Sequence, residues 1–180
     1  MTQHEYVFVA ISIILGLAIT RQLHTVGMLI RAHGRVSFHW STALWGLCVM
    51  CYSLQLWWIG WELNHVTEWS FGNYVILTAG SIFVYGAAEM ALPVPEGSND
   101  LDFLKHSQGL GRLSALSMLL YYAVGPYVNV SMFQNEVMPS LAIPALGITL
   151  MILVISFPRV FPAFSILFCL YTGLVLALTA

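Results

Sequence analysis

The chain has 180 residues, of which 59% are hydrophobic and 8% charged, and its mean hydropathy is +0.82. Soluble domains carry about 25% charged residues, so the polar surface that a soluble fold of this size requires is missing. The net charge is −2 and the few bases are scattered, which excludes the basic patch of a nucleic-acid-binding protein. The composition predicts an integral membrane protein without a nucleic-acid partner.

Six segments are long and apolar enough to cross a bilayer, which takes about 20 apolar residues in a helix. Lipid offers no partner for backbone polar groups, so each segment is expected to be an α-helix. The expected helices are 6–28, 40–62, 73–93, 113–131, 139–157 and 160–179. They predict one all-α transmembrane domain over residues 1–180.

Breaker residues separate the later helices. Pro93–Asp100 is polar and rich in proline and glycine, so it ends the third helix and opens a loop over 94–112 that suits a short interfacial helix. Phe157–Pro162 contains two prolines, and the residue before each proline resists the helical region. This stretch favours two final helices; the alternative is a five-span chain in which 139–179 is one bent element.

The bases predict the orientation. Cytoplasmic loops of membrane proteins are enriched in Lys and Arg, and with six spans the first, third and fifth loops share one side. These loops contain all the loop bases, namely Arg31, Arg35, Lys105, Arg112 and Arg159. The prediction is a multi-pass protein of a bacterial inner membrane with the 94–112 loop in the cytoplasm and both termini on the periplasmic side.

One polar cluster is expected within the bilayer. Arg21 and His24 are one helical turn apart, and Arg21 and Glu89 both fall in the half of the membrane nearer the basic loops. Intramembrane ionisable groups tend to pair with each other, which predicts an Arg21–Glu89 ion pair with His24 or Gln22 beside it. Such a pair ties two helices together or forms a proton or ligand site; the alternative is that Arg21 extends independently to the headgroups.

A second cluster lies at the periplasmic end of the second helix. It contains Gln55, Trp57, Trp58, Trp61 and Glu62. One interpretation is an aromatic pocket for an amphipathic ligand such as a lipid or quinone. The other is an aromatic belt at the membrane interface plus one glutamine bonded across helices.

Motifs of enzymes and cofactor proteins are weak or missing. Cys48 and Cys51 form a C-x-x-C in mid-helix, remote from water and from any base that would create a thiolate, so we interpret both as packing residues. Only His24 lies within a helix away from its ends, whereas a bis-histidine haem needs two such residues. No metal and no cofactor is predicted, and no catalytic residue is assigned.

Part of the chain resembles a family of small polytopic bacterial inner-membrane proteins of no known function. The resemblance covers most of residues 5–105 and rests on Ile11–Thr20 with Leu23, Gln55–Trp58, Trp69–Phe71, Leu92–Pro93 and Asp100–Leu101. It implies the same general fold and a bacterial host. Arg21 and His24 depart from the family's pattern, so it implies no role for them.

The leading functional expectation is a non-enzymatic membrane protein, acting as an accessory subunit or a small homo-oligomeric module with lipids and a protein partner. The first alternative is a small channel or transporter whose path Arg21, His24 and Glu89 line. The second is a quinone- or haem-linked electron-transfer protein that uses the aromatic cluster.

Overall fold

The computed structural model describes residues 2–66, 69–95 and 100–179. Six long helices account for most of these ranges. They are α1 (Gln3–Arg31), α2 (Trp40–Glu62), α3 (Phe71–Ala91), α5 (Arg112–Tyr127), α6 (Val137–Ser156) and α7 (Phe161–Thr179). Each helix, with its short extensions, is long and apolar enough to cross a membrane. The expectation of an all-α chain with six such helices is confirmed.

Short elements connect the long helices. They are η1 (His33–Arg35), β1 (Val36–Ser37), η2 (Leu63–His65), β2 (Leu101–Asp102), α4 (Phe103–Gln108), η3 (Val128–Met132, a π-helix) and η4 (Pro158–Val160). The strands β1 and β2 pair in parallel and join two loops that are distant in sequence. Two residues are too few to show an alternating pattern, so this strand pair could not be predicted from the sequence. The helix α4 falls within the expected 94–112 loop, of which residues 96–99 lie outside the described ranges.

The helix boundaries follow local chemistry. Thr2 and Glu5 form a capping box at the start of α1, which satisfies donors that a helix leaves unpaired. The side chain of Ser70 accepts a hydrogen bond from Asn73 at the start of α3. Pro158 begins η4 between α6 and α7, so 139–179 forms two helices rather than one bent element.

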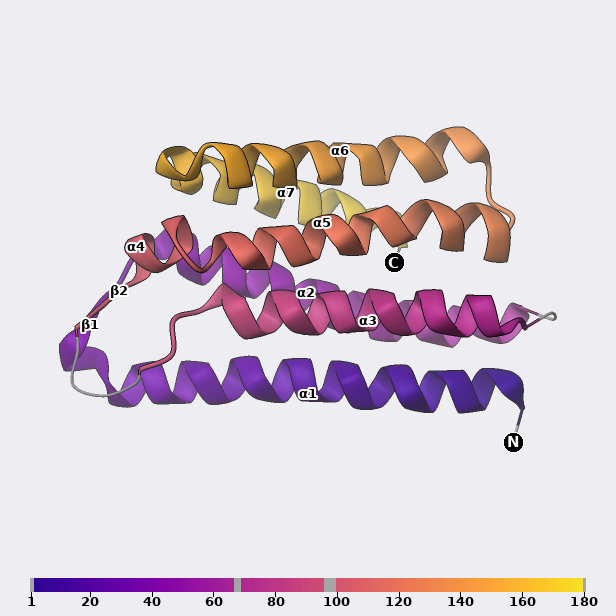
Figure 1. Cartoon of the computed structure of the whole chain (residues 1–180), viewed down its shortest axis with the longest axis horizontal. Coiled ribbons are helices and arrows are strands. Elements are labelled where there is room, and N and C mark those ends of the chain that lie inside the picture. Colours follow the sequence, from indigo (N-terminus) through magenta and orange to yellow (C-terminus); the bar gives the residue numbers. More distant parts are fainter. Residues whose placement is uncertain (1, 67–68, 96–99, 180) are drawn as a thin grey trace.

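Five of the long helices form a closed ring. Around the ring, α2 packs on α3, α3 on α5, α5 on α6, α6 on α7 and α7 on α2. The remaining helix, α1, packs on α2 and α3 from outside the ring. Figure 1 shows α1 and α3 side by side, with α5 and α6 on the far side of α3 from α1.

The two ends of the bundle differ in charge. One end, here called the basic end, holds η1, β1, β2, α4 and η4, and therefore all five loop bases (Figure 1, left). The opposite end, here called the terminus end, holds the N-terminus, η2 and the α5–α6 connection (Figure 1, right). The last turn of α7 also faces the terminus end.

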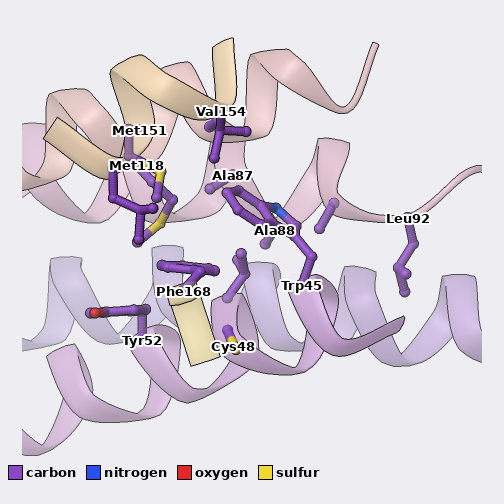
Figure 2. Packing of buried hydrophobic residues seen from close by; sticks show 14 of the residues in the cluster. Trp45, Cys48, Tyr52, Ala87, Ala88, Leu92, Met118, Met151, Val154 and Phe168 are labelled. Carbon is purple, nitrogen blue, oxygen red and sulfur yellow. The ribbon is translucent and has the colours of Figure 1, made fainter. Parts of the chain in front are cut away.

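Large side chains fill the half of the ring nearer the basic end. Trp45 lies at the centre of this core, with its ring centroid 4.4 Å from that of Phe168 and 5.4 Å from that of Phe161. Met118 and Met151 close the core from α5 and α6 (Figure 2). The Trp45 indole donates a hydrogen bond to Ser114 Oγ at 3.0 Å, and this hydroxyl donates to the Ala87 carbonyl at 2.8 Å. This chain of bonds links α2, α5 and α3.

Candidate functional site

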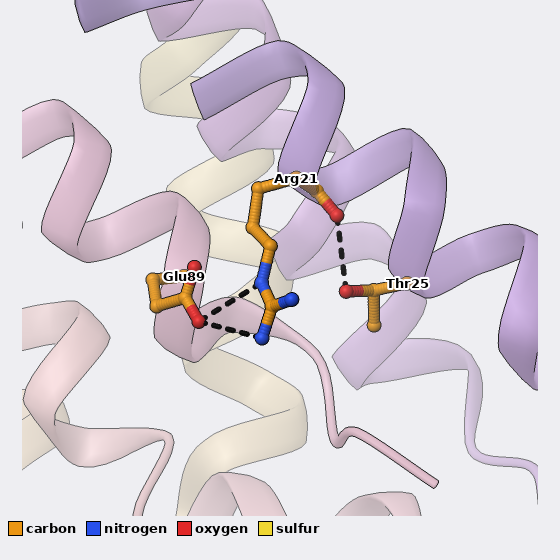
Figure 3. A network of polar contacts seen from close by, with 3 residues as sticks. All are labelled: Arg21, Thr25 and Glu89. Atoms are coloured by element: carbon orange, nitrogen blue, oxygen red, sulfur yellow. Dashed lines mark hydrogen bonds and ion pairs between the residues drawn. The ribbon is translucent and has the colours of Figure 1, made fainter. Parts of the chain in front are cut away.

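Arg21 and Glu89 form an ion pair between α1 and α3. The Arg21 Nε donates to Glu89 Oε1 at 2.9 Å, and Nη2 lies 2.8 Å from the same oxygen (Figure 3). The two side chains are 35% and 33% exposed. The Arg21 carbonyl accepts a bond from the Thr25 hydroxyl at 3.0 Å. Arg21 therefore does not extend independently to the headgroups, and the pair joins two neighbouring helices.

The other two members of the expected polar cluster lie apart from this pair. Gln22 is buried against α2, and its amide nitrogen donates to the Gly46 carbonyl of α2 at 3.2 Å. His24 is exposed on the surface of α1. The structure thus brings together only Arg21 and Glu89 of the four residues. Gln22 instead links α1 to α2.

The expected aromatic cluster divides into two groups. Trp57, Trp58 and Trp61 are exposed and form a shallow groove with Phe8 and Leu54 on the outer surface of the bundle. Gln55 and Glu62 instead line a larger cleft inside the ring. The tryptophans and the two polar residues therefore do not form one pocket.

The cleft occupies the half of the ring nearer the terminus end. Its volume is about 710 Å³, within the range of pockets that hold small molecules. It opens at the terminus end, where the exposed residues Glu62, Asn135 and Glu136 line it. It reaches inward to Tyr52, which lies about 15 Å from Glu62 along α2.

Small and helix-breaking residues are found along this cleft. Gly60, Gly80 and Gly125 lie in its wall, and a Cβ added at each would lie within 3.5 Å of a neighbouring side chain, namely Phe8, Val124 and Pro144. Pro126 lies within α5, where its missing N–H removes a helical hydrogen bond, and the π-helix η3 follows. Pro144 lines the cleft from within α6. Large side chains therefore fill one end of the ring, whereas glycine and proline occur along the cleft at the other.

Tyrosines form the floor of the cleft. The rings of Tyr52, Tyr121, Tyr122 and Tyr171 contact one another, with centroids 5.6 to 5.9 Å apart. The Tyr171 hydroxyl donates to the Ile143 carbonyl at 2.9 Å. The hydroxyls of Tyr52 and Tyr122 are buried next to each other, and neither makes a hydrogen bond of standard distance and angle among the described residues.

Gln55 is a further buried polar residue that lines the cleft. Its amide nitrogen donates to Thr179 Oγ1 at 3.1 Å, which ties α2 to the end of α7. Its amide oxygen is buried and lacks a partner among the described residues. The floor therefore presents two phenols and one amide oxygen whose hydrogen-bonding capacity the described part of the protein does not use.

Sequence reasoning identified Gln55 and Glu62 but missed the tyrosine floor and Glu136. Two signals were present. Tyr121 and Tyr122 put two hydroxyls in a predicted span, where a buried hydroxyl usually finds a partner, and Pro144 interrupts another span. Pockets in membrane bundles often lie where helices are interrupted.

Two other groups of residues, the potential metal ligands and the cysteines, do not form a binding site among the described residues. Among the described residues, no three His, Cys, Asp or Glu side chains come together in a way that would hold a metal ion. Cys48, Cys51 and Cys169 are free thiols in α2 and α7, and Cys48 is buried in the core.

The chain matches no protein-family model, no curated protein and no solved structure. The class that the fold defines is therefore general: a helical bundle with six helices suited to crossing a membrane.

Proposed function

We propose that this protein is a multi-pass membrane protein of the bacterial inner membrane that acts by binding an amphipathic ligand, without catalytic chemistry of its own. The observation that supports this proposal is the cleft, which combines about 710 Å³ of space with apolar walls and a polar floor. Binding sites for small molecules are concave and mostly apolar, with a few polar groups that orient the ligand. The chain performs this role as an accessory subunit or homo-oligomer in contact with lipids.

The proposed orientation places the basic end in the cytoplasm and both termini in the periplasm. It is supported by the gathering of Arg31, Arg35, Lys105, Arg112 and Arg159 at one end, the pattern of cytoplasmic loops. The cleft then opens toward the periplasmic face.

The transporter alternative has less support. Arg21, His24 and Glu89 do not line the cleft, and the core around Trp45 and Phe168 fills the ring below the tyrosine floor. The geometry therefore favours a pocket with one opening over a path between the two ends.

Photolabelling in lipid nanodiscs tests the binding proposal. Three probes share one diazirine-bearing decyl chain and differ in their heads, which are an alcohol, a phosphate and a trimethylammonium group. We expect at least one probe to label peptides of the cleft wall in α5, α6 or α7, as mapped by mass spectrometry. Labelling that is confined to the outer surface for all three probes would refute the proposal.

A matched pair of variants identifies the cleft as the labelled site. Ile59 lines the cleft, whereas Ile82 is 51% exposed on the outer surface of α3. We expect Ile59→Trp to fill part of the cleft and lower cleft labelling several-fold. Ile82→Trp adds the same side chain outside the cleft and should leave the labelling unchanged.

A further inference from the structure

We infer that the cleft binds its ligand through a neutral head that bears carbonyl or hydroxyl oxygens, and that Tyr52, Tyr122 and Gln55 hold this head at the floor. The inference rests on the proposed binding function and adds the chemical class of the ligand and the residues that select it.

The first support is the set of unused polar atoms at the floor. Tyr52, Tyr122 and Gln55 are 1%, 4% and 6% exposed. Both phenol hydroxyls and the Gln55 amide oxygen lack a partner among the described residues. Buried polar atoms are almost always hydrogen-bonded, because leaving them unpaired is unfavourable. Three such atoms on one floor indicate a ligand that supplies their partners.

The chemistry of the three atoms defines the head. A phenol hydroxyl donates a hydrogen bond to a carbonyl or hydroxyl oxygen. The Gln55 amide oxygen only accepts, and the Gln55 nitrogen already donates to Thr179. The floor thus offers phenol hydroxyls that donate or accept and an amide oxygen that accepts, a set that suits a compact head with carbonyl oxygens, hydroxyl groups or both, as in a quinone or a quinol.

The charges of the cleft exclude an anionic head. Among the residues that the structure describes, no Lys, Arg or His lines the cleft, and the two carboxylates that line it, Glu62 and Glu136, are exposed at the opening. A phosphate or carboxylate head would enter past two negative charges and meet no cation at the floor. Moving an unpaired ion into such a site is strongly unfavourable.

The packing of the tyrosines disfavours a cationic head at the floor. An aromatic cage holds an ammonium group over ring faces that surround it. Here the rings of Tyr52 and Tyr122 meet edge to face at a centroid distance of 5.6 Å, and those of Tyr122 and Tyr171 do the same. Rings at this distance contact each other directly and leave no space for a cation between them.

Competition against the photolabel tests the inference. Decyl benzoquinone, decyl phosphate and decyltrimethylammonium are added to the full chain in nanodiscs, and the loss of cleft labelling gives the affinity of each compound. We expect decyl benzoquinone to compete best. A net hydrogen bond contributes roughly five-fold in affinity, so Tyr52→Phe and Tyr122→Phe should each weaken decyl benzoquinone by about five-fold and the double variant by about 25-fold.

The control is Tyr85→Phe, which makes the same change in a tyrosine of α3 that does not line the cleft. We expect no change in affinity for this variant. The free energy of unfolding should be unchanged or higher in Tyr52→Phe and Tyr122→Phe, because the removed hydroxyls have no protein partner to lose. A loss of stability would show that the hydroxyls already bond within the protein and would overturn the inference.

Failure of the inference differs from failure of the proposed function. If a probe labels the cleft but both phenylalanine variants retain full affinity for decyl benzoquinone, the binding function stands and the inference is wrong. Stronger competition by decyltrimethylammonium that is lost in Glu62→Gln or Glu136→Gln would instead place a cationic head at the opening. If no probe labels the cleft, the proposed function itself fails.

Discussion

Glu89 lies in the last turn of α3, where the carbonyl end of the helix dipole is unfavourable for a carboxylate. The Arg21 guanidinium offsets this effect by placing two nitrogens within 2.9 Å of Glu89 Oε1. The second oxygen, Oε2, is buried and has no hydrogen-bond partner among the described residues. Arg21 on α1 and Glu89 on α3 therefore neutralise each other, because neither charge has an oppositely charged partner on its own helix.

Exchanging the two charges tests this interpretation. We expect Arg21→Glu and Glu89→Arg each to lower the free energy of unfolding by about 1 kcal/mol or more, because each single variant places like charges together. The double variant should recover most of the loss. Unfolding in mixed micelles of increasing dodecyl sulfate content measures the three values. Single losses that persist in the double variant would show that the two residues act separately.

At the scale of helices, tyrosine side chains of α5 and α7 pack against the backbone of α6 at the cleft floor. A Cβ added at Gly147 would lie 2.7 Å from the Tyr171 hydroxyl oxygen and 2.8 Å from the Tyr122 ring. Only glycine permits this approach, and the approach positions the tyrosine rings. Gly173, on α7, has no atom within 4 Å of an added Cβ.

These two glycines provide a matched comparison. We expect Gly147→Ala to lower the free energy of unfolding by about 1–3 kcal/mol through overpacking and to displace the tyrosine floor. Gly173→Ala should be neutral or stabilising by about 0.5–1 kcal/mol, because alanine favours the helix. The same mixed-micelle unfolding experiment compares them. Equal effects at both positions would contradict the packing argument.

The short helix α4 contains a pH-sensitive contact at the basic end. His106 Nε2 lies 3.1 Å from the Met90 carbonyl oxygen, which ties α4 to the end of α3. Burial lowers the pKa of His106, although its hydrogen bond to Met90 acts in the opposite direction. The folded protein therefore favours the neutral imidazole more than the unfolded chain does.

The sign of the pH dependence follows from this shift. Below the ordinary histidine pKa of about 6.5, the unfolded chain takes up a proton that the folded protein resists, so stability falls as the pH is lowered from 7.5 toward 5. We expect His106→Gln to flatten this part of the stability profile. Asn64→Gln, which alters an exposed residue of η2 that does not titrate, serves as the control and should leave the profile unchanged. An unaltered slope in His106→Gln would refute the contribution.

At the scale of the whole molecule, charge and volume are both distributed unevenly. The basic end carries five of the six Lys and Arg residues and the large core side chains, whereas the terminus end carries the cleft and its two carboxylates. The proposed orientation accounts for the charge distribution, because it places the positive end in the cytoplasm. The open end of the cleft then faces the periplasm.

Cysteine labelling tests that orientation. Gly34 at the basic end and Asn64 at the terminus end are exposed, and Gly34 has open space around an added Cβ. We expect a membrane-impermeant maleimide to label Asn64→Cys in intact spheroplasts and Gly34→Cys only after permeabilisation. The unmodified chain, whose three cysteines lie within α2 and α7, gives the background. The reverse labelling pattern would invert the proposed orientation.

The sequence by itself determined the number and approximate bounds of the long helices. The expected 40–62 agrees with α2, and the other five agree within three residues at each end apart from η3, which completes the expected 113–131. This succeeds because the length and apolar character of a membrane-spanning helix are local properties of the chain. The Arg21–Glu89 pair could also be predicted from the sequence, because the number of residues between each charge and the end of its helix gives its depth in the membrane.

Only the tertiary structure decided where the cleft lies and which residues line it. Nothing local distinguishes Tyr122, which faces the cleft, from Tyr85, which does not. The sequence also could not separate Gln55 from the tryptophans beside it, because all four lie within two turns of α2. The rotation of each helix about its axis is set by packing against its neighbours, so the site becomes visible only when the ring of five helices is closed.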